Sequence, residues 1–127
     1  MPSSNRDPNL KKKTVAVGRR FEARAETFYS ENGYEIIERN WRAGRKEIDL
    51  IVRKDSVLAF VEVKAASSTS FGHPSEKVDE KKRAHLTEAA HRFIAERGIK
   101  GVDFRFDVIT FVRGKLEHFP GAFEATG

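Results

Sequence analysis

The sequence predicts one α/β domain, in which helices flank a mixed β-sheet in the order helix, strand, strand, strand, helix, strand, strand. Two observations support this fold class. Apolar residues recur at helical spacing in two segments, and β-branched, apolar or aromatic residues run together or alternate in five others. With 127 residues, 39% of them hydrophobic, the chain is long enough to bury a single core.

The first stretch of the chain is polar, contains proline and ends in three lysines. Residues 1–13 are therefore predicted to form a flexible basic arm, and residues 14–127 the single domain. The arm is expected either to follow the phosphates of a partner or to be an inert, solvated tail.

The first helix is expected over residues 15–32, and Asn32-Gly33 supplies its stop signal. Glu22 lies at the edge of the apolar stripe of this helix. It is either a solvated surface residue or, if that edge packs toward the sheet, a neighbour of acids there. The stripe itself consists of Val17, Phe21, Ala25, Phe28 and Tyr29.

A first strand is predicted over residues 34–41, followed by a basic loop at residues 42–46. Such a loop beside an acidic site can hold a phosphate backbone. The alternative is a solvated loop that only softens the repulsion between nearby carboxylates. The basic residues concerned are Arg39, Arg42, Arg45 and Lys46.

The next two strands contain the segments KEIDLIV (46–52) and AFVEVK (59–64), joined by a turn at Asp55-Ser56. With this turn Asp49 lies opposite Glu62, and a slip of one residue would mix the two faces of the sheet. A slip of two residues would keep the faces and set Glu47 opposite Glu62, which is still a pair of carboxylates. Two carboxylates about 4 Å apart repel by about 4 kcal/mol at an effective dielectric near 20. A divalent cation reverses the sign of that energy, and oxygen ligands suit Mg²⁺ or Mn²⁺.

The same register sets Glu47 opposite Lys64 and places Ile48, Leu50 and Val52 on one wholly apolar face. The alternative to a metal site is that each acid pairs with a nearby Arg or Lys. For Lys64 this alternative is a cross-strand salt bridge to Glu47, worth at most about 1 kcal/mol if exposed.

A long Ser- and Thr-rich loop is predicted at residues 65–77, and Asp79 is expected to cap a second helix that ends at Gly98. Lys81, Lys82 and Arg83 lie at the start of this helix. Basic residues there oppose the helix macrodipole, which favours an anionic partner nearby. Two more strands are predicted at residues 102–112 and 115–119.

Composition narrows the function classes. The chain has no cysteine, which excludes disulfides and thiolate zinc sites. Its net charge of +5 favours nucleic acid as a partner, with an anionic membrane second. No apolar run is long enough to span a bilayer and no signal peptide is visible, so a cytoplasmic protein without membrane contact is expected.

The order in which the acidic residues follow one another along the chain resembles a known nuclease pattern. A helix glutamate (Glu22), a strand aspartate (Asp49) and Glu-x-Lys in the next strand (Glu62, Lys64) resemble the PD-(D/E)xK nuclease superfamily. The flanking motifs more closely resemble the YraN-like family of small, endonuclease-like bacterial proteins, over nearly the whole folded region. These motifs are Gly33-Tyr34, RNWR (39–42), EIDLI (47–51), FVEVK (60–64), RFDV (105–108) and His118-Phe119.

The resemblance implies a restriction-endonuclease-like fold and a site. Asp49 and Glu62 would hold Mg²⁺ or Mn²⁺ with the carbonyl of Val63, and Glu22 would complete the cluster, as in the similar archaeal Holliday-junction resolvases. Lys64 would orient the attacking water. The expected activity is metal-dependent hydrolysis of DNA phosphodiesters, with branched or flapped DNA among the substrates. A homodimer is a further expectation, and a non-catalytic nucleic-acid-binding protein of the same fold is the alternative.

The chain departs from the family pattern at two positions. Lys46 stands where the family usually has Gly, and Arg83 stands where a Gln is common. Both changes add positive charge near the expected site without removing a ligand.

Overall fold

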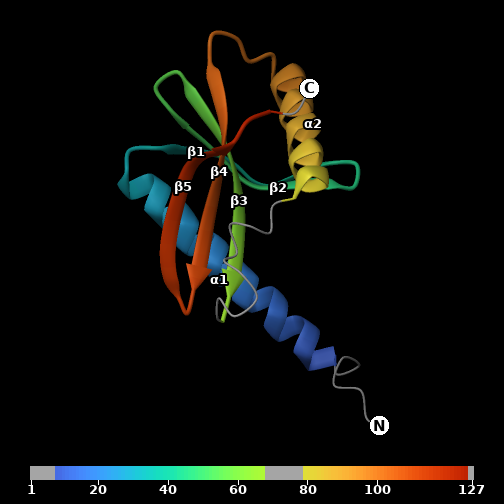
Figure 1. Cartoon of the computed structure of the whole chain (residues 1–127), viewed down its shortest axis with the longest axis vertical. Helices are drawn as coiled ribbons and strands as arrows, with labels where there is room; N and C mark the ends of the chain where they lie inside the picture. Colours follow the sequence, from blue (N-terminus) through green and yellow to red (C-terminus); the bar gives the residue numbers. More distant parts are fainter. Residues whose placement is uncertain (1–7, 68–78, 126–127) are drawn as a thin grey trace.

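The computed structural model describes residues 8–67 and 79–125, with the backbone alone for residues 8–17. Its elements follow the predicted order, so the α/β fold class is confirmed. One sheet with strand order β1-β2-β3-β4-β5 is antiparallel except between β3 and β4, which are parallel and joined through α2 (Figure 1). The elements are α1 (Pro8–Glu31), β1 (Glu35–Ala43), β2 (Lys46–Lys54), β3 (Val57–Ala66), α2 (Glu80–Arg97), β4 (Asp103–Val112) and β5 (Lys115–Phe123).

Helix α1 begins at Pro8, earlier than predicted. Proline is favoured in the first turn of a helix, and the Leu, Lys and Ala residues that follow are good helix formers. Residues 8–13 of the predicted arm therefore belong to the helix, and residues 1–7 lie outside the described part of the chain. The helix ends as predicted, with Gly33 at a φ of 84° and Tyr34 N–H donating to the carbonyl of Tyr29.

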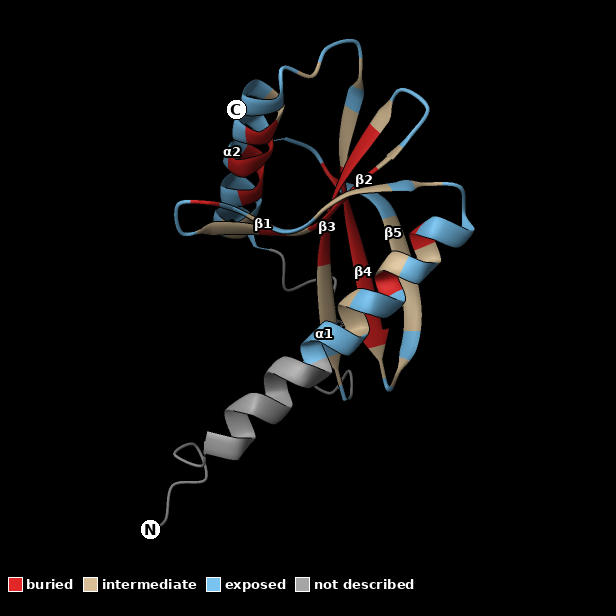
Figure 2. Ribbon diagram, turned by 180° about the vertical axis from the view of Figure 1, so that it is seen from behind, coloured by how far each residue is buried: buried red, intermediate tan, exposed pale blue. Residues whose placement is uncertain are grey.

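Each helix covers one face of the sheet with its own apolar cluster (Figure 2). On the α1 face, Ala25 and Tyr29 of the predicted stripe are fully buried, and Phe21 and Phe28 pack at the margin. The side chain of Val17 lies outside the described residues. The sheet separates this cluster from the cluster on the α2 face. The protein therefore has two cores, one on each side of a single sheet.

Helix α2 follows its predicted capping signals. The Asp79 carboxylate accepts the N–H of Lys82 at 2.9 Å, and Gly98 closes the helix in the left-handed conformation. Strand β3 continues to Ala66, so the predicted loop begins later than expected, and its residues 68–77 lie outside the described residues. Among the described residues, none of the helices is long and apolar enough to cross a membrane.

The predicted β2–β3 register is confirmed from Lys54↔Val57 to Leu50↔Val61, but the ladder ends there. The direct pairs predicted beyond it, which include Asp49 with Glu62, are not part of the ladder. The prediction of one wholly apolar face is wrong at Ile48, which packs in the α2 cluster while Leu50 and Val52 pack in the α1 cluster. Side-chain alternation is therefore interrupted between residues 48 and 50.

Two other boundaries differ from the predictions. The basic loop predicted at residues 42–46 is a two-residue turn, because Arg42 pairs with Glu47 in the β1–β2 ladder and Gly44 adopts a φ of 64°. Strand β5 extends beyond residue 119 to Phe123, whose ring stacks on that of Phe106 at 4.8 Å. Strand β5 continues as far as Phe123, and the ring of this residue packs in the α2 cluster.

Candidate functional site

Three acids from three elements approach one another where β2 and β3 separate. Asp49 of β2 accepts the backbone N–H of Val63 at 2.8 Å. Glu62 of β3 is only 6% exposed, and its Oε2 has no hydrogen-bond partner among the described atoms. Glu22 of α1 lines the same cavity as Asp49. The structure therefore brings the helix edge that carries Glu22 toward the sheet acids.

The surroundings of Asp49 and Glu22 disfavour their ionised forms. Burial, together with the charge of Glu62, raises the pKa of Asp49 to about 7, although the Val63 N–H opposes the change. Burial and the charge of Glu47 also raise the pKa of Glu22. At neutral pH the site thus holds carboxylates that destabilise one another, and a cation placed between them would relieve the repulsion.

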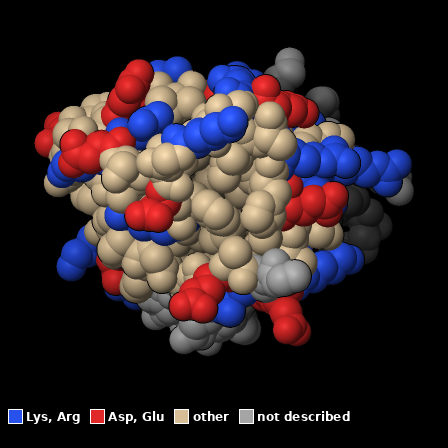
Figure 3. Space-filling model, turned by 90° about the horizontal axis from the view of Figure 1, so that it is seen from above, with Lys and Arg blue, Asp and Glu red and all other residues tan. Residues whose placement is uncertain are grey.

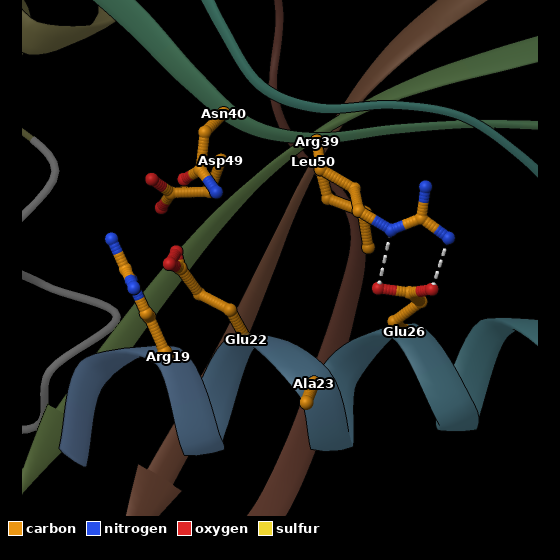
Figure 4. Close-up of a pocket in the computed structure, with 8 residues that line it drawn as sticks. All are labelled: Arg19, Glu22, Ala23, Glu26, Arg39, Asn40, Asp49 and Leu50. Atoms are coloured by element: carbon orange, nitrogen blue, oxygen red, sulfur yellow. Dashed lines mark hydrogen bonds and ion pairs between the residues drawn. The ribbon is translucent and has the colours of Figure 1, made fainter. Parts of the chain in front are cut away.

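The cavity beside α1 has a volume of about 120 Å³. Figure 4 shows Glu22 and Asp49 with their carboxylates turned toward each other and Arg19 reaching up from the helix beside them. A single water needs about 10–15 Å³ of such space, so the cavity has room for an ion with several waters. The lining residues are Arg19, Glu22, Ala23, Glu26, Arg39, Asn40, Asp49 and Leu50.

Two lysines lie beside Glu62. The ammonium of Lys64 is 3.6 Å from Glu62 Oε1, and that of Lys82, from the first turn of α2, is 3.5 Å from the same oxygen. Lys64 therefore pairs with Glu62 instead of forming the cross-strand bridge to Glu47 that was its alternative. Lys82, predicted only as a nucleic-acid contact, lies within the acid site.

The donor set fits a hard divalent cation. The unpartnered Glu62 Oε2 and the raised pKa of Asp49 both mark negative charge that a cation would balance. Oxygen ligands favour Mg²⁺ or Mn²⁺ over softer metals. Within the described residues, however, no three or more His, Asp or Glu side chains already form a group able to hold a metal ion. The acids are candidate ligands and do not form a complete cage.

The family follows from comparison with known proteins. The model of the uncharacterised protein family UPF0102 matches residues 21–111, a span that includes all four of the candidate catalytic residues. The chain belongs to UPF0102. This is the YraN family that the sequence motifs indicated.

Curated relatives of this UPF0102 chain support the assignment over most of its length. A UPF0102 protein of Chloroherpeton thalassium is 45% identical over 98 residues, which cover 77% of this chain and 76% of the relative. One of Persephonella marina is 36% identical, with coverage of 84% and 92%. One of Beutenbergia cavernae is 39% identical, with coverage of 84% and 94%.

The basic residues predicted to contact nucleic acid do not form one group in this UPF0102 protein. Arg42 is exposed, 3.8 Å from Glu47, and Arg45 is exposed in the β1–β2 turn. Lys46 forms an ion pair with Glu88 of α2. Arg39 is held by Glu26 of α1, with Nε 2.9 Å from Oε2, so its guanidinium is engaged within the fold.

The basic residues of α2 also separate. Lys82 turns to Glu62, while the guanidinium of Arg83 lies 5.4 Å from the centre of the Phe123 ring. Lys81 is exposed. The face seen in Figure 3 carries Lys and Arg interspersed with Asp and Glu, so the net positive charge is not gathered into a continuous basic surface on that side.

Sequence reasoning did not select four residues of the cavity lining, and two of them, Arg19 and Asn40, lie beside the acids. Arg19 was not selected, although it lies three residues before Glu22 and therefore on the same face of α1. Asn40 was included only in a motif, although Asn is uncommon in strand interiors and tolerates positive φ. The signal in the sequence is an Asn inside a strand pattern, and the structure shows it at a φ of 48°.

Proposed function

We propose that this protein is a Mg²⁺-dependent endonuclease that hydrolyses DNA phosphodiester bonds. The observation that supports it most is a buried Glu62 with one unpartnered oxygen, close enough to Asp49 to help raise its pKa to about 7. The other oxygen of Glu62 lies 3.6 Å from the ammonium of Lys64. A buried acid, a half-buried acid and a lysine at one point are costly to a fold that makes no use of them. The net charge of +5 and the resemblance to the PD-(D/E)xK superfamily support DNA as the substrate.

The residues of the chain take distinct roles in this proposal. Asp49 and Glu62 would hold the cation with the carbonyl of Val63, and Glu22 would approach from α1. When bound, the cation supplies Lewis-acid chemistry, lowering the pKa of water and offsetting phosphate charge. Lys64 would hydrogen-bond the attacking water and stabilise charge that develops on the phosphate. Attack of water on phosphorus forms one P–O bond and breaks another, leaving a phosphate and a hydroxyl at the cut ends.

A second candidate function is nucleic-acid binding without cleavage. It is favoured by the way Lys64 and Lys82 already neutralise Glu62, and by the absence of a preformed metal group among the described residues. In that case the acids would be balanced within the fold, and the exposed Arg42, Arg45 and Lys81 would act by contacting phosphates.

The test is a panel of labelled junction, flap, single-stranded and duplex DNA, incubated with Mg²⁺ or Mn²⁺ and with or without chelator. Cleavage of at least one substrate that chelator abolishes is the expected result. If every substrate is bound in a salt-dependent manner and none is cut, the endonuclease proposal fails and the binding function replaces it.

The Lys64→Ala variant is expected to lower kcat by about 100-fold or more, because it removes the ammonium proposed to orient the attacking water and to stabilise charge on the phosphate. Its DNA affinity should change much less, since one ammonium in the site contributes little to binding along a backbone. Single-turnover cleavage and filter binding measure the two effects. Lys100→Ala, at an exposed lysine after α2, is the control. An unchanged kcat would mean that Lys64 has no role in cleavage and serves only as the ion-pair partner of Glu62.

A further inference from the structure

Besides the bulge between Ile36 and Glu38, strand alternation fails at a second point of the β1–β2 pair. Consecutive side chains of a strand normally point to opposite faces. Arg39 and Asn40 nevertheless line the same cavity, and so do Asp49 and Leu50 on the facing strand. By strict alternation from Leu50, which packs on the α1 face, Asp49 would face α2. It faces α1 instead, on the side of Glu22.

The interruption falls at Asn40, the only described residue within β1 that has a positive φ. A φ of 48° lies in the left-handed region, which most L-residues avoid and which Asn tolerates better than almost any other non-glycine residue. The next pair, Trp41 and Ile48, packs on the α2 face. The positive φ of Asn40 thus lies at the same point of the strand pair as the change that directs the side chain of Asp49 into the cavity.

The side chain of Asn40 acts on the same acids. Its amide is oriented with the nitrogen toward two carboxylates, because the opposite orientation would set its oxygen against theirs. In this orientation it donates to Glu22 Oε2 at 3.1 Å and to Glu47 Oε1 at 3.3 Å. Glu22 and Glu47 repel each other, so one amide group holds together two carboxylates that would otherwise move apart. Asn40 and Glu22 also share the neighbouring cavity with Glu47.

We propose that Asn40 is the positioning residue of the acid site: its left-handed backbone turns Asp49 toward α1, and its amide holds the carboxylate of Glu22 at the same cavity. The metal-binding part of this inference rests on the proposed function. Asn meets both requirements at once, since Gly would supply the backbone conformation without the amide and Gln the amide without the tolerance of positive φ.

The Asn40→Gly variant separates the two roles. Glycine adopts a φ of 48° freely, so the strand pair should keep its turn while the amide is lost. We expect its affinity for Mn²⁺, measured by titration calorimetry, to fall by about tenfold or more, the usual effect of removing a group that orients metal ligands. Asp55→Gly makes the same change at another positive-φ residue, in the β2–β3 turn, and should leave Mn²⁺ affinity unchanged. Wild-type affinity in Asn40→Gly would overturn the positioning role of the amide.

A metal-free experiment separates this inference from the proposed function. In a double-mutant cycle, Asn40→Gly and Glu22→Ala are combined and melting temperatures are measured in chelator. If the amide holds Glu22, the two shifts will be non-additive by roughly 3 °C, and additive shifts would overturn the inference. A wild-type protein that takes up no Mn²⁺ and cuts no DNA defeats the metal-dependent function, while this cycle still decides whether Asn40 positions Glu22.

Discussion

The Asp49→Asn variant is expected to lose metal-dependent cleavage and, in the absence of metal, to unfold at a higher temperature than the wild type at pH 8. The loss of cleavage should exceed about 100-fold, because removing a group that only supports a metal ligand costs about 10- to 100-fold and Asp49 is proposed as a ligand itself. The gain in stability has a separate origin. The amide oxygen of Asn can still accept the Val63 N–H, while the repulsion between residue 49 and Glu62 disappears.

The pH dependence of that gain follows from the raised pKa of Asp49. In the unfolded chain this carboxyl ionises near its ordinary pKa of 3.8, whereas in the folded protein it ionises at about 7. Between these values the unfolded state releases the proton more readily, so the wild type loses stability as the pH rises from about 4 to 7. The variant lacks this loss. Its advantage in melting temperature should therefore be absent near pH 4 and complete above pH 7.

Melting curves from pH 4 to 8, recorded with chelator and then with Mg²⁺, measure both effects. Mg²⁺ should raise the melting temperature of the wild type at pH 8, since a ligand that binds only the folded state stabilises it, and should leave the variant unchanged. Asp103→Asn, at an exposed carboxylate that begins β4, is the matched control and should show neither effect. Equal stability of Asp49→Asn and wild type at every pH would mean that the acids do not repel one another, which removes the main support for a cation site.

The sequence predicted those features of the site that local patterns determine. The register from Leu50 to Lys54 follows from a two-residue turn and from apolar alternation that a slip would disrupt. The limits of α2 follow from Asp79 and Gly98, whose capping chemistry is local. The acids could be placed on the correct elements for the same reason, because their strands and helix were recognised from periodicity.

Features that depend on tertiary packing could not be predicted. Whether Glu22 faces the sheet depends on how α1 lies across it, which the apolar stripe fixes only approximately. Lys46 of strand β2 pairs with Glu88 of α2, and Lys82 of α2 pairs with Glu62 of β3. Both ion pairs form only when α2 packs against the sheet. The break in alternation depends on the backbone of Asn40, where a residue of low strand propensity interrupts a pattern that otherwise indicates an ordinary strand.

A buried polar network on the α1 face leads to the largest expected effect on stability. Asp107 of β4 is 0% exposed. It accepts hydrogen bonds from the hydroxyl of Tyr29 at 2.8 Å, from Nε of Arg105 at 2.8 Å and from the backbone N–H of Gly121 at 3.0 Å, and its Oδ2 lies 3.0 Å from Nε2 of His118. One carboxylate therefore ties helix α1 to strands β4 and β5.

The Asp107→Ala variant is expected to lose about 3–5 kcal/mol of unfolding free energy, because removing one partner of a buried charge pair leaves the others uncompensated. For a domain of this size that loss lowers the melting temperature by about 10 °C or more. Denaturant titration measures the free energy, and Asp103→Ala, at the exposed start of the same strand, is the control. A melting temperature close to that of the wild type would show that the network adds nothing to stability.

The same carboxylate gives a second, independent test in acid. Burial raises the pKa of Asp107, but the hydrogen bonds from His118, Arg105, Gly121 and Tyr29 outweigh it and lower the pKa to about 2. Because the folded pKa lies below the unfolded value of 3.8, the ionised carboxylate stabilises the protein above pH 4, and this stability is lost as the pH falls toward 2. The Asp107→Asn variant, which keeps the shape without the charge, should lose stability at neutral pH and show a flatter stability profile between pH 4 and 2. A wild-type profile that is already flat in this range would contradict the lowered pKa and, with it, the charge that joins α1 to the sheet.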